Sequence, residues 1–275
     1  MPQKTLITLL KIYLPKSEIY SPIWILAQNT IKALVRKKDF YVFFMMLIVL
    51  LAFLMSERFF GVDDISRYMK DIGFFCLWLF SFIIAVTFSA KQLPEEIQSK
   101  AVYPLLAKPV SRFHFLAGRF LGALLASSAA YTVFYALYTC VILTKGEGVA
   151  LPLLIQAYIL GICFLSIACA ISIFLTLYLT LSAAVTASFI IYFSVAWFID
   201  TIRAYVIHAK GLSLLLSNIV YYLIPHYEFF DLRVRLAHSW EAFPLWVICF
   251  LLIYTIAYTG MILLMSLVKL RRKVF

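Results

Sequence analysis

The chain has 275 residues, of which 64% are hydrophobic and only 13% are charged, and its formal net charge is +11. A soluble domain is about a quarter charged, so this composition excludes an ordinary water-soluble fold and indicates a protein surrounded by lipid. The basic residues cluster beside long apolar runs, which explains the charge by membrane topology and argues against a nucleic-acid partner.

Residues 1–38 are predicted to be a cytoplasmic N-terminal segment without a cleavable signal peptide. Within this segment, residues 23–35 place apolar side chains on one helical face, while Gln28, Lys32 and Arg36 follow one another on another face. This pattern predicts an amphipathic interfacial helix whose basic face meets anionic headgroups. A cytoplasmic extension of the first span is the alternative.

Six apolar segments follow, and their lengths can be compared with the roughly 20 residues that a helix needs to cross a bilayer core. They cover residues 40–55, 72–90, 115–143, 151–178, 183–199 and 245–268. The fourth and fifth form one run that is too long for a single crossing, and Thr180 and Ser182 mark the predicted turn. The expected fold class is therefore an all-α integral membrane protein, with six transmembrane helices in a domain that covers residues 39–268.

The distribution of basic residues predicts the orientation, because cytoplasmic flanks are enriched in Lys and Arg. With six spans and a cytoplasmic N-terminus, sixteen of the 24 Lys and Arg residues lie in cytoplasmic segments and eight lie outside. Four of the sixteen are in the basic tail, residues 269–275. We therefore expect a multi-pass protein of a bacterial or archaeal cytoplasmic (inner) membrane, with both termini in the cytoplasm.

The cytoplasmic loop between spans two and three, residues 91–114, is expected to contain a short helix. Pro94 followed by Glu95 and Glu96 is typical of a helix start, because proline fits the first turn and acids suit the positive end of the helix dipole. Pro104 cannot continue the helix, which should end near Tyr103. These residues alone fit a docking element and a plain connector equally well.

The outer segment, residues 200–243, is too hydrophobic for a plain loop. Residues 211–224 are apolar but short for a crossing, and Pro225 ends the run, so a re-entrant or interfacial extracytoplasmic helix is expected. A seventh span is the alternative. It would place the C-terminus outside, against the basic tail.

Two stripes mark the third span. Small residues at four-residue spacing predict a close helix–helix contact: Gly118, Gly122, Ala126 and Ala130. Hydroxyl and aromatic residues form the other stripe: Ser128, Tyr131, Thr132 and Tyr135, followed by Tyr138 and Thr139. This second stripe is either a candidate substrate path or a set of interhelical hydrogen bonds.

Catalytic motifs are missing from the sequence. It has no Gly-x-x-x-x-Gly-Lys-Ser/Thr nucleotide loop, no metal-binding His/Cys/carboxylate spacing, and five cysteines without a Cys-x-x-Cys pair. No acid or base lies deep in a predicted span, which argues against an ion-coupled carrier working alone. We therefore expect no enzyme activity and no cofactor bound by this chain.

The loop sequence LPEEIQSKAVYPLLAKPVSRFHFLAGRFLG resembles the signature between spans two and three of ABC-2 type transporter permeases. The matching positions are Glu95, Glu96, Leu105, Leu106, Pro109, Val110, Ser111, Arg112, Gly118, Arg119 and Gly122. Ser99 and Lys100 stand where the family commonly has Gly-Thr. The stretches WILAQNTIKALVRKKDFYVFF and YYLIPHYEFFDLR resemble the interfacial helix and the outer segment of nitrous-oxide-reductase-maturation and sodium-export permeases.

The resemblance implies a membrane-spanning permease subunit that moves a substrate across the membrane. The energy would come from ATP, which a separate ABC ATP-binding subunit would bind together with Mg and hydrolyse. The loop would then hold a coupling helix, with Glu95, Glu96, Pro109, Ser111 and Arg112 as the ATPase-coupling residues. A second permease copy, in a homodimer, would complete the substrate path. The alternatives are a membrane assembly or scaffold protein that acts with a periplasmic partner through residues 201–243, and a stand-alone ion-coupled carrier.

Overall fold

The computed structural model describes Tyr41, Met45, Ile48 and Val49 and the ranges 65–98, 112–144, 150–208 and 211–272. These residues form helices joined by short turns, with no strand among them. The elements are α4 (Ile65–Gln98), α6 (Arg112–Thr144), α7 (Leu151–Thr176), α8 (Leu181–His208), α9 (Leu212–Leu223), the 3-10 helix η2 (Tyr227–Phe230), α10 (Arg233–Ala237) and α11 (Leu245–Arg272).

Five of these helices, α4, α6, α7, α8 and α11, are long and apolar enough to cross a membrane. The prediction of an all-helical, multi-pass membrane protein is confirmed at this level. The expected first span at residues 40–55 and the expected interfacial helix at residues 23–35 lie outside the described residues, apart from four positions. Those four, Tyr41, Met45, Ile48 and Val49, are helical and exposed.

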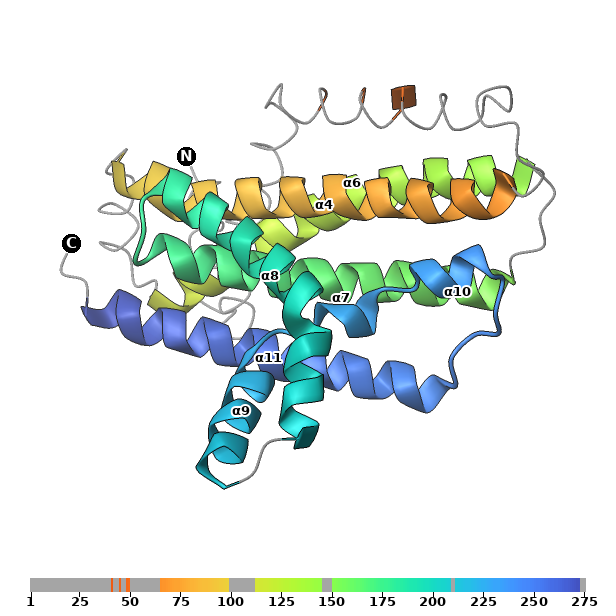
Figure 1. Ribbon diagram of the computed structural model, residues 1–275. Helices are drawn as coiled ribbons and strands as arrows, with labels where there is room; N and C mark the ends of the chain where they lie inside the picture. Colours follow the sequence, from red (N-terminus) through yellow and green to blue (C-terminus); the bar gives the residue numbers. More distant parts are fainter. Residues whose placement is uncertain are drawn as a thin grey trace, which may run out of the picture.

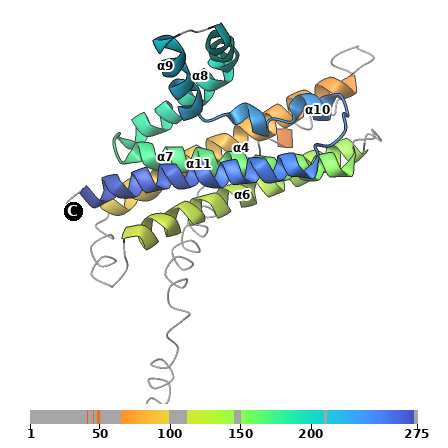
Figure 2. The same ribbon diagram turned by 90° about the horizontal axis from the view of Figure 1, so that it is seen from below.

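Helices α4, α6, α7 and α11 lie side by side and form the bundle (Figure 1). Helices α4, α7 and α11 end where α6 and α8 begin, so the chain alternates in direction from one helix to the next. We call this the Arg112 end of the bundle, after the first residue of α6. Helix α8 crosses the bundle obliquely, and its second half projects from it together with α9 (Figure 2).

Burial separates central from peripheral helices. Helix α7 is apolar on all sides, and most of its residues are buried, which is typical of a helix enclosed by others. In the most apolar stretches of α8 and α11, only 28% of the residues are buried. Both helices carry exposed large apolar side chains, among them Trp197 and Phe198 of α8 and Phe250 and Ile256 of α11, so both present apolar surface to their surroundings.

The predicted turn between the fourth and fifth segments is confirmed, because α7 ends at Thr176 and α8 begins at Leu181. Helices α4, α6, α8 and α11 are longer than the apolar segments predicted, whereas α7 is two residues shorter. Helix α8 continues to His208, into the expected outer segment, and α11 continues to Arg272, into the expected tail. Helix α9 has 12 residues, about 18 Å at 1.5 Å per residue, which is well short of a bilayer core about 30 Å thick.

The expected helix start at Pro94 is wrong. Helix α4 runs without a break from Ile65 to Gln98 and contains Pro94 in its interior. Proline removes only one helical N–H, and the neighbouring side chains hold this turn in place, since Leu93 is 1% exposed and Gln92 is also buried. The loop between the second and third spans is therefore shorter than the 91–114 assignment.

Candidate functional site

At the Arg112 end, the start of α6 is hydrogen-bonded to the end of α11. Arg112 is the first residue of α6, and its Nη1 donates to the carbonyl oxygens of Leu270 and Arg271, each at 2.8 Å. The last carbonyls of a helix have no partner within the helix, and a guanidinium near them also suits the negative end of the helix dipole. Arg112 thus links the start of one span to the end of another.

A buried arginine joins α6 to α4 two turns further into the bundle. Arg119 is 8% exposed, and its Nη1 donates to Oε1 of Gln92 at 3.4 Å. Its guanidinium also lies 5.9 Å from the ring centroid of Phe115. Arg119 lies inside α6, where a buried charged group requires polar partners.

The remaining expected coupling residues are placed only in part. Glu95 and Glu96 belong to the last turn of α4, and their side chains lie outside the described part of the structure. Pro109 and Ser111 also lie outside the described residues. The structure therefore brings together Arg112, the end of α4 and the end of α11 at one end of the bundle.

The small-residue stripe of α6 is buried along its length: Gly118, Gly122, Ala126 and Ala130. Helix α6 packs against α4, α7 and α11. The buried position of these residues fits the close helix contacts that small side chains allow.

The hydroxyl stripe of α6 is used for bonds between and within helices. Tyr131 donates to the carbonyl of Ala157 at 3.3 Å, and Tyr135 donates to that of Leu154 at 2.6 Å, both on α7. Bonds made by the rest of the stripe link Thr132 to Tyr158 at 2.8 Å, Tyr138 to the carbonyl of Lys70 at 2.9 Å, and Ser128 to the carbonyl of Leu125 at 3.0 Å. These contacts favour interhelical hydrogen bonding over a substrate path along this face.

Aromatic rings fill the space between α4, α7, α8 and η2. Phe164 of α7 lies at the centre of this cluster, 4.2 Å from Trp78 and 5.3 Å from Tyr227 between ring centroids. Tyr192 of α8 packs 5.7 Å from Phe164 and 4.5 Å from Phe82. Close ring packing of this kind leaves no route for a substrate through this part of the bundle.

The segment that joins α9 to α11 is hydrogen-bonded to α7 and α11. The side-chain amide of Gln156 on α7 donates to the Phe243 carbonyl at 2.7 Å and accepts from the Phe243 N–H at 2.8 Å. Tyr258 of α11 donates to the carbonyl of Leu223, the last residue of α9. The sequence analysis missed Gln156, although an amide inside an apolar run needs polar partners and is a signal for such a contact.

His226 is a buried titratable group of this segment. It is 4% exposed, lies between the rings of Tyr221 and Phe229, and has its Nδ1 3.8 Å from Glu228 Oε1. Glu228 in turn pairs with Arg203 of α8. Burial lowers the pKa of His226 below its ordinary value of 6.5, and this effect outweighs the nearby Glu228 carboxylate.

Acidification is therefore expected to destabilise this segment. The pKa of His226 is lower in the folded chain, so the unfolded chain binds more protons below pH 6.5. The contribution of His226 to the free energy of unfolding is therefore complete above pH 6.5 and decreases as the pH falls below that value. We expect His226→Gln to reduce the loss of thermal stability between pH 8 and pH 5, measured on the purified chain in detergent. His238→Gln, at an exposed histidine, is the matched control and should keep the wild-type dependence. Equal pH profiles for the wild type and His226→Gln would contradict this assignment.

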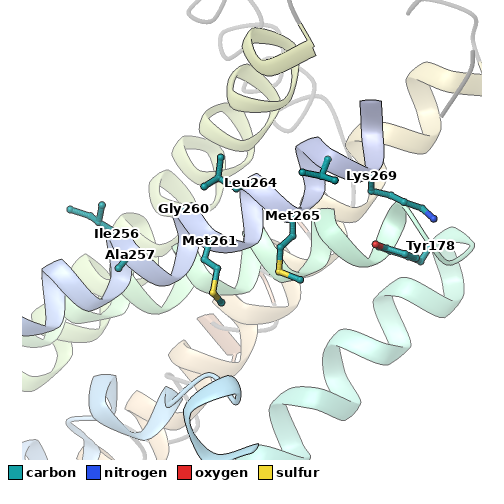
Figure 3. A pocket seen from close by; sticks show the side chains of 9 residues that line it. Tyr178, Ile256, Ala257, Gly260, Met261, Leu264, Met265 and Lys269 are labelled. Atoms are coloured by element: carbon teal, nitrogen blue, oxygen red, sulfur yellow. The ribbon is translucent and has the colours of Figure 1, made fainter. Parts of the chain in front are cut away.

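An open groove of about 720 Å³ runs along the exposed face of α11 near the Arg112 end (Figure 3). Its apolar lining comes from α11 and includes Ala257, Gly260, Met261 and Leu264. Tyr178, in the turn between α7 and α8, closes one end, with Lys269 Nζ 4.5 Å from the centroid of its ring. Hydropathy and periodicity do not indicate this groove.

The fold and these contacts define an all-helical, multi-pass membrane protein. Hydrogen bonds link α4, α6 and α11 near the Arg112 end, and aromatic rings fill the interior. Among the described residues, no group of three His, Cys, Asp or Glu side chains lies close enough together to hold a metal ion. No protein-family model matches the chain, and no curated protein is significantly similar to it.

Proposed function

We propose that the chain is the membrane-spanning permease subunit of an ABC-2 type transporter, driven by ATP that a separate subunit hydrolyses. The observation that carries the proposal is the unbroken course of α4 from Ile65 to Gln98. Glu95 and Glu96, the expected docking residues, belong to the same helix as the buried residues of the bundle. Because α4 is one continuous helix, a partner bound at its last turn would be joined directly to the buried part of the bundle.

The contacts of α4 support transmission of such a movement to the other helices. It packs against α6, α7, α8 and α10, and its Gln92 is bonded to Arg119 of α6. Arg112 extends the connection to the end of α11. A partner that bound at the Arg112 end would therefore act on most of the described helices at once.

The aromatic interior bears on where a substrate would pass. Because Trp78, Phe164 and Tyr192 fill the space between α4, α7 and α8, we place the path between two copies of the chain, in a homodimer. Rearrangement of the two copies against each other would then open the path alternately to the two sides of the membrane.

Photo-crosslinking tests the proposed docking site. We expect a photoreactive residue at position 96 to trap an ATP-binding subunit in native membranes, while the same residue at position 241, at the opposite end, does not. A partner trapped at 241 with none at 96 would contradict the proposal. That result would favour an assembly or scaffold protein that binds its partner through residues 201–243.

A further inference from the structure

The groove on α11 has the dimensions of one lipid chain. It extends from Ile256 to Lys269, about 20 Å at 1.5 Å per residue, and one leaflet fills about half of a 30 Å bilayer core. Gly260 is one of the lining residues, and a Cβ built there meets no atom within 4 Å, so the groove is open at this point. The flexible, polarizable side chains of Met261 and Met265 also line the groove, and they can adapt to the changing shape of an acyl chain (Figure 3).

The charged end of the groove complements a phosphate. Lys269 lies at the Arg112 end of α11 and is followed by Arg271, which is exposed, and by Arg272 and Lys273 in the sequence. The ring of Tyr178, 55% exposed, orients the Lys269 ammonium from one side. Tyrosine and lysine at the end of a span are typical of the headgroup level of a membrane.

We propose that this groove binds one anionic phospholipid, with an acyl chain along Ala257, Gly260 and Leu264 and its phosphate at Lys269. A single molecule of this class supplies both the apolar chain and the negative charge that the groove presents. The site does not depend on the proposed transport function.

Filling the groove tests the acyl-chain position. In Gly260→Leu the new side chain enters open space, so the fold is retained and the lipid is displaced. The wild-type chain, purified in detergent and mixed with equal phosphatidylglycerol and phosphatidylcholine, should retain one phosphatidylglycerol in native mass spectrometry. Gly260→Leu should lose this bound lipid. Ala196→Leu, at an exposed site on α8, adds the same bulk elsewhere and should retain it.

Removing the charge tests the headgroup position. One basic residue near an anionic surface changes the affinity by about fivefold, so Lys269→Gln should lower the preference for phosphatidylglycerol over phosphatidylcholine by about that factor. Three results would overturn the proposal: no lipid preference in the wild type, unchanged lipid retention in Gly260→Leu, or a loss of dimer mass in Gly260→Leu without loss of lipid. The third result would identify a second copy as the occupant.

Discussion

Reversing both charges at the end of α4, in Glu95→Arg with Glu96→Arg, is expected to reduce partner-stimulated ATP hydrolysis to below about one tenth of the wild-type rate. Like charges brought together at an interface cost several kcal/mol, and the resemblance places basic residues of the partner opposite these two acids. The measurement is ATP hydrolysis by the complex purified through a tag on this chain. Insertion into the membrane should be unaffected, because both residues follow the apolar part of α4.

The matched control is Glu241→Arg, which reverses an exposed acid at the opposite end of the bundle. The Glu241 backbone carbonyl, not its side chain, accepts the bond from Arg235, so this contact survives the substitution. We expect wild-type hydrolysis in this variant. Unchanged hydrolysis in the double charge reversal would show that the end of α4 is not the coupling element.

The largest expected effect on stability is that of Gly161→Ala, which should lower the free energy of unfolding by about 1–3 kcal/mol. A Cβ at position 161 would lie 2.1 Å from the Tyr131 hydroxyl oxygen and 2.4 Å from its Cζ. The Tyr131 ring cannot move away easily, because it is 1% exposed, stacks on Tyr158 and donates to the carbonyl of Ala157. The contact between α6 and α7 would therefore have to widen.

Gly260→Ala provides the matched control for this substitution. Both glycines are in spans, but nothing lies within 4 Å of a Cβ at position 260. Alanine favours a helix over glycine by up to about 1 kcal/mol, so this variant should be as stable as the wild type or more stable. Thermal unfolding of the purified chains in detergent measures both. Equal midpoints for the two variants would mean that α6 and α7 pack less tightly than described.

Much of the helical fold could be predicted from hydropathy, because a bilayer requires long apolar helices. The five described spans overlap their expected apolar segments and the turn near Thr180 is where it was expected, although α4 and the end of α8 extend seven to nine residues beyond them. Helix ends were less predictable, since packing can extend a helix into polar sequence. Pro94 is the clearest case, because proline normally marks a helix boundary, yet the buried Leu93 keeps α4 continuous.

The contacts of the candidate site depend on residues far apart in the sequence and could not be predicted from local patterns. Arg112 bonds α11 residues more than 150 positions away, and Gln156 bonds Phe243 across 87 positions. The hydroxyl stripe of α6 could be identified from the sequence, but its hydrogen bonds to the backbone carbonyls of α7 could not. The groove on α11 depends on open space beside Gly260, which periodicity does not reveal.

Purification of the tagged chain from its native membranes tests the central claim most directly. If the chain is a permease driven by a partner's ATP, an ATP-binding subunit should travel with it, and the purified complex should hydrolyse ATP. A chain that is recovered intact and folded, without an ATP-binding partner and without ATP hydrolysis, would contradict the proposed function.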